Sequence, residues 1–162
     1  MNEISISFIA YEHGERHFGE NYFQSLKRRS VSLPSDIKWH FIGHLQSNKA
    51  KGLVEIDNLY VIETVDSVKL AKVLNNACEK IDKKVNIFLQ VLSSEEDTKS
   101  GIKPSEVIGI VETIMSDFTN LNLIGLMSIG QIGDLEGFQM MYDLKCRFYL
   151  DLTLWDVNNI YL

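Results

Sequence analysis

Strand-like and helix-like segments alternate along the whole chain of 162 residues, and this alternation constrains the fold more than any other feature. The segment 86–91 is almost continuously apolar, as parallel strands covered on both faces are. Regular alternation of strands and helices predicts right-handed βαβ units and a parallel sheet. Short runs of β-branched and apolar residues predict five strands, at residues 17–21, 38–43, 59–63, 85–91 and 121–127.

Helical periodicity separates these predicted strands. Apolar residues recur at spacings of three and four over residues 67–81 and again over residues 105–118, which places them on one face of a helix. Asp66 or Ser67 is a suitable N-cap for the first of these helices, and Pro104 opens the second.

Two architectures satisfy this order of elements, an open doubly wound sheet and part of a (β/α)8 barrel. The nucleotide-binding motifs that favour a doubly wound sheet, G-x-G-x-x-G and the Walker loop, are missing. Periodicity alone leaves both architectures open. No linker or low-complexity tract interrupts the pattern, so we expect a single domain over residues 1–162.

The composition, with 45% hydrophobic and 23% charged residues, is typical of one globular domain with a core. No apolar run approaches the ~20 residues of a membrane span, and no basic segment precedes an apolar one at the start. A net charge of −6 argues against nucleic acid as a partner, and the basic cluster Lys27-Arg28-Arg29 is interpreted as a solvated helix end. Cys78 and Cys146 are interpreted as buried free thiols of a reducing compartment. We expect a cytoplasmic protein, with a mitochondrial location as the alternative.

Two predicted strand ends carry glycines and polar residues that a strand filling a core does not need. Residues 38–49 read KWHFIGHLQSNK, and residues 17–22 read HFGENY. In parallel α/β proteins, ligands bind at the carboxyl ends of the strands. The sequence therefore predicts a ligand site where these strands end.

These segments resemble the motifs of the pyridoxal 5′-phosphate homeostasis proteins, also called the proline synthetase co-transcribed family. The likeness continues in the same order with ETVDS at residues 63–67 and GLMSI at residues 125–129. His44 after Gly43, in place of proline, is similar to the eukaryotic branch of the family. The likeness covers roughly residues 10–145, and residues 146–162 form a divergent tail.

The resemblance implies a single-domain barrel like that of the alanine racemase N-terminal domain, and so favours the (β/α)8 architecture. It also implies bound pyridoxal 5′-phosphate (PLP), no established enzymatic turnover, and a role in holding and delivering the cofactor. A racemase-like enzyme on the same barrel is an alternative, and its chemistry would need an imine together with an opposing acid–base residue.

Two parts of the family pattern have no counterpart here. In the family the cofactor forms an imine with a lysine at the end of the first strand, whereas the first lysine of this chain is Lys27. Lys27 and Lys49 are the two candidates to replace the family lysine, but neither is expected at the position where the cofactor forms its imine. The family's last two strands, which supply most of the phosphate contacts, are also unmatched. We therefore expect an incomplete barrel, truncated at both ends to roughly strands two to six, in which covalent attachment of the cofactor is not expected.

The resemblance and the strand ends give five candidate cofactor-binding residues: Asn21, His40, His44, Met127 and Ser128. The amide of Asn21 has two interpretations, a contact to the cofactor and a cap for the helix that follows. His40 is interpreted as a core histidine or a ligand contact, and His44 lies at a strand–helix turn. Met127 packs against a ring or within the core.

The remaining polar groups predict no chemistry of their own. Glu63 and Asp66 end a predicted strand, and helix capping by Asp66 is a simpler interpretation than acid–base catalysis. No His/Cys cluster has the spacing of a metal site and no Gly-x-Ser-x-Gly motif is present, so we predict no metal and no catalytic residue.

A sheet cut from a barrel has two edges with unpaired backbone groups, and an apolar face exposed at ~25 cal/mol for each Å² left in water. We therefore expect self-association through the sheet edges. A fragment that binds no cofactor and pairs its edges with an intact relative is the alternative. The apolar run LTLW at residues 152–155 is long enough to cover one edge.

Overall fold

The computed structural model describes residues 3–92, 100–130, 135–147 and 153–156 of the chain. Six parallel strands form one sheet, and their spatial order follows their order in the sequence. The strands are β1 (His17–Glu20), β2 (Lys38–Phe41), β3 (Leu59–Val65), β4 (Val85–Gln90), β5 (Leu121–Ser128) and β6 (Thr153–Asp156).

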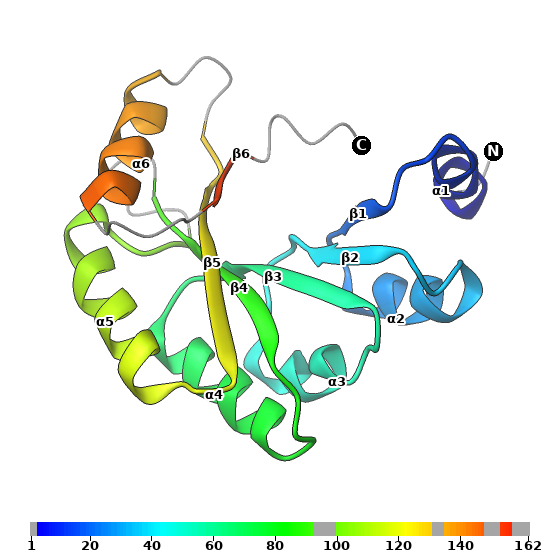
Figure 1. Ribbon diagram of the computed structural model, residues 1–162, viewed down its shortest axis with the longest axis horizontal. Helices are drawn as coiled ribbons and strands as arrows, with labels where there is room; N and C mark the ends of the chain where they lie inside the picture. Colours follow the sequence, from blue (N-terminus) through cyan, green and yellow to red (C-terminus); the bar gives the residue numbers. More distant parts are fainter. Residues whose placement is uncertain (1–2, 93–99, 131–134, 148–152, 157–162) are drawn as a thin grey trace.

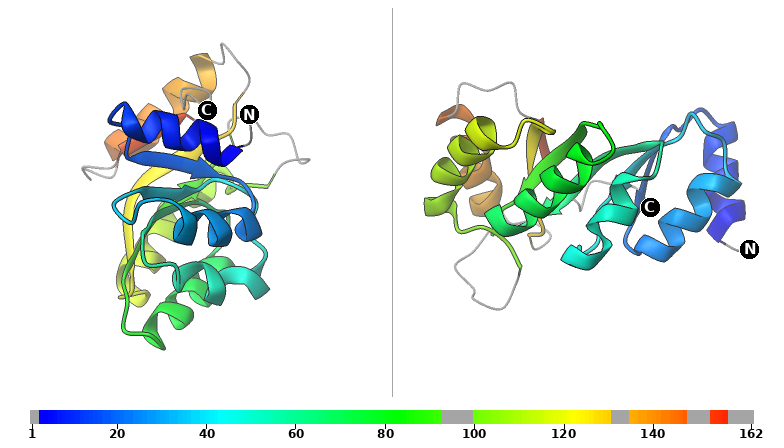
Figure 2. Two further views of the ribbon diagram at one scale, coloured as in Figure 1. Left: turned by 90° about the vertical axis from the view of Figure 1, so that its right-hand side faces the viewer. Right: turned by 90° about the horizontal axis from the view of Figure 1, so that it is seen from below.

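The helices that connect the strands lie along one face of the sheet, and the strands of the sheet fan out (Figure 1). Figure 2 shows α1 and α2 at the end of the molecule that contains β1, and α5 and α6 at the opposite end. The helices are α1 (Glu3–Glu12), α2 (Phe23–Ser32), α3 (Ala50–Val54), α4 (Val68–Glu79), α5 (Val107–Asp117) and α6 (Leu135–Arg147), with short 3-10 turns at Ser47–Lys49 and Pro104–Glu106.

The main core lies between the sheet and these helices. Alternate strand residues point toward the helices, where their side chains are almost completely buried: Trp39, Ile62, Ile87, Leu89 and Leu126. Helix α4 supplies Leu70, Leu74 and Cys78 to the same core. The hydroxyl of Ser67 caps α4 by accepting a hydrogen bond from the N–H of Leu70 at 3.3 Å.

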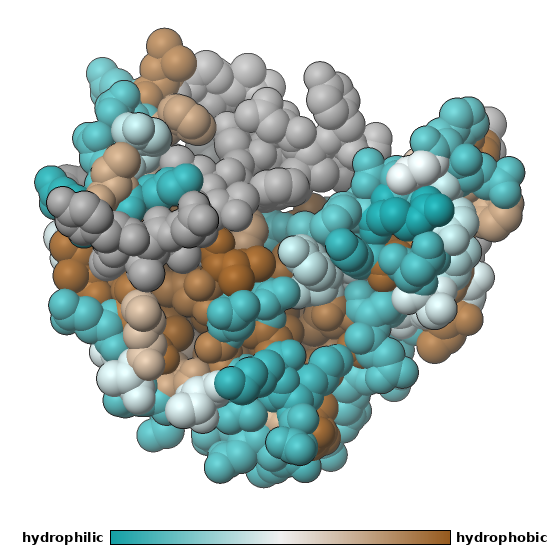
Figure 3. Space-filling model, viewed as in Figure 1, coloured by the Kyte–Doolittle hydropathy of each residue, from teal (hydrophilic) through white to brown (hydrophobic). Residues whose placement is uncertain are grey.

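The opposite side of the sheet, called the inner face below, has a smaller apolar cluster. Val61, Phe88 and Met127 are buried there, and Tyr60 and Ile124 pack against them. Apolar residues are visible at the centre of this hollowed side in Figure 3, with hydrophilic residues around them. In a closed barrel this face would be the interior, so the sheet with helices on one side is a partial (β/α)8 barrel.

The parallel sheet and the five predicted strands are confirmed, with end positions that shift by one or two residues. The two predicted helices are also present, as α4 and α5. The divergent tail adds a sixth strand that the prediction of strands two to six did not include. In that strand Thr153 pairs with Gly125 and Asp156 with Ser128, so β6 covers the edge of β5 as the apolar run suggested.

Two predictions about side chains are wrong. Cys78 is buried, but Cys146 is exposed, because only one side of α6 packs against the core. Lys27 and Arg28 are exposed as expected of a solvated helix end, whereas Arg29 is buried. Its guanidinium has an acidic partner within the core, described below. None of the described helices is long and apolar enough to cross a membrane.

Candidate functional site

The carboxyl ends of β1 and β2 approach each other closely. Asn21 follows β1 directly, and Gly43 lies two residues after β2. A Cβ atom built on Gly43 would overlap the backbone oxygen of Asn21. Only glycine allows this approach, so the glycine of the KWHFIGHLQSNK segment has a packing role at the predicted site.

Asn21 and His44 are both exposed at this end of the sheet. The side chain of Asn21 does not cap α2, because Tyr22 is the N-cap residue and no side chain accepts from the first turn. The amide of Asn21 makes no hydrogen bond to another residue that the structure describes. The imidazole of His44 lies 4.0 Å from a carboxylate oxygen of Asp66, which follows β3.

His40 is the centre of a hydrogen-bonded chain that crosses three strands on the inner face. Its Nδ1 lies 2.5 Å from Oε1 of Glu63, and its Nε2 lies 2.8 Å from Nδ1 of His17. In one pair of tautomers, Nδ1–H of His40 donates to the Glu63 carboxylate and Nδ1–H of His17 donates to Nε2 of His40. The rings of both histidines also contact Tyr60, at centroid distances of 5.1 and 5.3 Å.

This chain runs from the core to the surface. Glu63 has no exposed area and His40 is buried, whereas His17 lies at the exposed start of β1. Burial lowers the pKa of His17, and the nearby charges of His40 and Lys38 lower it further. His40 is thus the hydrogen-bonded core histidine of the two predicted alternatives, and burial disfavours the charged form of His17.

The hydroxyl groups near the strand ends hold neighbouring backbone. Ser128, buried at the end of β5, donates from Oγ to the carbonyl of Val91 at 2.9 Å. Thr64 donates in the same way to the carbonyl of Gly43 at 2.6 Å. Met127 is fully buried and belongs to the inner apolar cluster.

The five candidate residues therefore do not form one contact cluster. Asn21 and His44 lie at the ends of neighbouring strands, Met127 and Ser128 end β5, and His40 lies inside β2. The predicted capping role of Asp66 is wrong, because Ser67 caps α4 and its hydroxyl donates to the Asp66 carboxylate at 3.1 Å.

Sequence reasoning missed a buried ion pair beside the site. Arg29 of α2 donates to a carboxylate oxygen of Glu20 at 2.8 Å and also to the hydroxyl of Ser7 in α1. Its guanidinium carbon lies 5.1 Å from the ring centroid of Trp39. The other oxygen of Glu20 accepts from the N–H of Tyr22 at 3.0 Å, so this carboxylate fixes the start of α2. Glu20 belongs to the FGEN motif that the sequence analysis identified. Its partner Arg29, nine residues later, was interpreted there as part of a solvated helix end.

Residues 6–145 of the chain match the family described as alanine racemase, N-terminal domain. The pyridoxal phosphate homeostasis protein of Schizosaccharomyces pombe is 41% identical over 142 residues, which make up 84% of this chain and 60% of the relative. The human protein of the same name is 42% identical over 149 residues, with 84% of this chain and 54% of the relative covered. The predicted resemblance is confirmed, and the chain spans between half and two thirds of the length of these relatives.

Solved structures give the same result. The structure of PipY of Synechococcus elongatus with PLP bound is 28% identical, with a TM-score of 0.75 over 93% of this chain and 74% of that one. The alanine racemase of Clostridium difficile, at 12% identity and a TM-score of 0.71, covers 93% of this chain and 43% of its own. This second likeness shows the fold alone, and both place the chain on the predicted barrel.

Proposed function

Because the chain belongs to the alanine racemase N-terminal domain family, we propose that it binds PLP at the carboxyl end of its sheet and serves PLP homeostasis without turning over a substrate. The observation that carries this proposal is the fold shared with PipY, whose solved structure has PLP bound. The names of the curated relatives support the homeostasis role. Two cysteines, free in the structure, support the cytoplasmic location that we include in the proposal.

The residues at this end of the sheet suit a phosphorylated ring. The start of α2 lies directly after Asn21 and has no side-chain cap, so its first N–H groups are available to an anion. The exposed amide of Asn21 and imidazole of His44 add hydrogen-bond donors beside it. We assign the phosphate to this position, between the ends of β1 and β2.

The remaining candidates give the site its shape. Met127 packs on Phe88 and Val61 within the inner apolar cluster, and these buried side chains support the strand ends that form the site. The hydroxyl of Ser128 donates to Val91 and keeps its lone pairs available as acceptors. His40 has a positioning role in this proposal, since its ring nitrogens face Glu63 and His17 rather than the strand ends.

The positions of the amines near the site support the proposed non-catalytic role. Bound PLP supplies an electrophilic aldehyde and an electron-withdrawing ring, and enzymes use it through an imine with a lysine. Lys27 lies exposed on α2 and Lys49 half-buried in the 3-10 turn after β2, and neither belongs to a strand. Binding at this end is therefore proposed to be non-covalent, and the racemase-like alternative is disfavoured.

Equilibrium dialysis of the purified chain against PLP tests the proposal. We expect saturable binding that Asn21→Ala combined with His44→Ala weakens about tenfold, the equivalent of one or two lost hydrogen bonds. The matched control is Asn76→Ala, an exposed asparagine on α4, which should bind as the unaltered chain does. Equal affinity of the double variant would place the cofactor elsewhere, and interconversion of L- and D-alanine by the PLP-loaded chain would establish the racemase alternative.

A further inference from the structure

Lys38 is the only lysine within the strands that the structure describes. It opens β2 and lies two residues before His40, so both side chains belong to the inner face. Its Nζ lies 5.3 Å from the ring centroid of Tyr60 on the neighbouring strand, within the range of a cation–π contact. The amine is therefore held against an aromatic ring at the amino end of the sheet, away from the proposed cofactor site.

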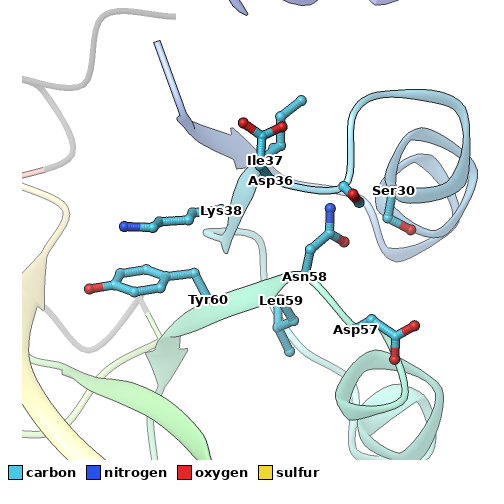
Figure 4. A pocket seen from close by; sticks show the side chains of 9 residues that line it. Ser30, Asp36, Ile37, Lys38, Asp57, Asn58, Leu59 and Tyr60 are labelled. Atoms are coloured by element: carbon cyan, nitrogen blue, oxygen red, sulfur yellow. The ribbon is translucent and has the colours of Figure 1, made fainter. Parts of the chain in front are cut away.

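Lys38 and Tyr60 also line one side of an open cavity of about 420 Å³. The cavity lies between the end of α2 and the first residues of β2 and β3. Figure 4 shows the side chains of Lys38 and Tyr60 extending in the same direction from adjacent strands. Polar groups that line the rest of the cavity are Ser30, Ser35, Asp36, Asp57 and Asn58.

Asn58 lines the same cavity, but its amide nitrogen is not accessible from it. Its Nδ2 is buried and has no partner among the described residues. The groups that can meet a small molecule beside this cavity are therefore the aromatic ring of Tyr60 and the amine of Lys38.

A proton acceptor lies beside the amine. His17 is directly opposite Lys38 in the register of β1 and β2, and its ring contacts Tyr60 edge-on. Burial and neighbouring positive charge lower its pKa, so the imidazole is neutral near pH 7. In the tautomer in which His17 donates from Nδ1 to His40, its Nε2 keeps the lone pair that accepts a proton.

We propose that Lys38 captures small uncharged aromatic aldehydes as a reversible imine in this cavity, a binding site additional to the cofactor site. The neutral amine forms a C–N bond to the carbonyl carbon, and the carbonyl oxygen becomes a hydroxyl. His17 passes one proton from Nζ to the carbonyl oxygen as this hydroxyl forms, and then passes the second proton from Nζ to the hydroxyl, which leaves as water when the C=N bond forms. Amine and aldehyde give imine and water, and nothing is oxidised or reduced.

The charges around the cavity set the class of aldehyde. Asp36 is paired with Arg16 at 2.9 Å and accepts from the hydroxyl of Tyr11 at 2.8 Å, but the carboxylate of Asp57 is exposed. A phosphate or sulfonate on the ligand would meet negative charge at this end of the sheet. The cavity therefore favours a neutral aromatic aldehyde over a phosphorylated aldehyde such as PLP.

Borohydride reduction followed by peptide mass mapping tests the proposal, with salicylaldehyde as the ligand. We expect one saturable adduct on the peptide that contains Lys38, absent in Lys38→Arg, which keeps the cation over Tyr60. Lys27→Arg, on the exposed face of α2, is the matched control and should keep the full adduct. Salicylaldehyde 5-sulfonate, at the same subsaturating concentration, should give about fivefold less adduct than salicylaldehyde does.

The rate of imine formation tests the role of His17. His17→Asn keeps an N–H that can reach His40 but removes the base, so capture should slow about tenfold or more while the final yield stays the same. Adducts spread over exposed lysines, with a total that Lys38→Arg leaves unchanged, would overturn the proposal. Dialysis against PLP separates the two sites, because Lys38→Arg should bind PLP normally. Adduct formation without PLP binding would refute only the proposed cofactor function.

Discussion

At the scale of single residues, Gly43 connects the sequence motif to the site. The backbone oxygen of Asn21 occupies the space that a side chain on Gly43 would need. Gly43→Ala should therefore force the ends of β1 and β2 apart and lower the free energy of unfolding by about 1–3 kcal/mol. Gly109→Ala is the matched control, since this helical glycine has open space around its Cα, and it should raise stability by up to ~1 kcal/mol. Urea unfolding checks both, and an undiminished midpoint in Gly43→Ala would contradict the close approach.

His17 makes a second prediction at this scale. Its pKa is lowered in the folded chain, whereas an unfolded imidazole titrates near ~6.5. The unfolded chain then binds more protons as pH falls through that value, so stability declines on acidification until the folded pKa is passed. His17→Asn should flatten this decline. Urea midpoints measured at about pH 7.5 and about pH 5.5 give the comparison, and equal slopes for both proteins would show that His17 is not the group responsible.

Sequence reasoning found these residues but not their partners. His40 and Glu63 each belong to a predicted strand, but their pairing was not predicted. The two residues are 23 positions apart, and neither segment alone determines the register between the two strands. Lys38 was seen only as the first letter of a motif. Its place beside Tyr60 and His17 depends on three strands packed in order.

At the scale of elements, α1 and Arg29 show why local pattern was insufficient at the start of the chain. Ile4, Ile6 and Phe8 alternate with polar residues, a pattern that favours a strand, yet residues 3–12 form a helix. Ser7 of this helix accepts from Arg29, whose other partner is Glu20. Tertiary contacts of this kind override local propensity. Helices α4 and α5, with clear apolar faces, were predicted from sequence to within a turn.

The buried ion pair gives the prediction that belongs to this scale. Arg29→Ala removes the cation and leaves the buried carboxylate of Glu20 without its partner, which should cost about 3–5 kcal/mol of stability. The adjacent Arg28 is exposed, so Arg28→Ala should change stability by no more than about 0.5 kcal/mol. Urea unfolding of both variants provides the measurement. Similar midpoints would mean that the Glu20–Arg29 pair does not tie α1, β1 and α2 together.

At the scale of the whole molecule, the partial barrel leaves backbone and apolar surface uncovered. In the described structure β1 pairs with β2 on one side and with no strand on the other, while β6 covers β5. Unpaired strand edges favour association with another chain. We therefore predict concentration-dependent self-association through the β1 edge. Sedimentation equilibrium tests this, and a monomer at all concentrations with a sharp cooperative melt would contradict it.

The fold class and family could be predicted from sequence at this scale, because several motifs in fixed order carry them and strand–helix alternation limits the architecture. The apolar run LTLW indicated that the tail could cover a sheet edge, but not which edge or register, since the four residues of β6 lie outside the family motifs and pair only with β5. The shape of the candidate site could not be predicted from sequence either, because its residues come from the ends of separate strands.

The central claim is that this chain binds PLP through the carboxyl end of its sheet without forming an imine with a lysine there. Equilibrium dialysis of the unaltered chain against PLP, with borohydride-trapped product measured on the same samples, tests it most directly. We predict saturable binding of one PLP per chain that leaves no covalent adduct at the carboxyl end of the sheet after reduction. Absence of saturable binding, or a stoichiometric adduct on Lys27 or Lys49, would contradict the account.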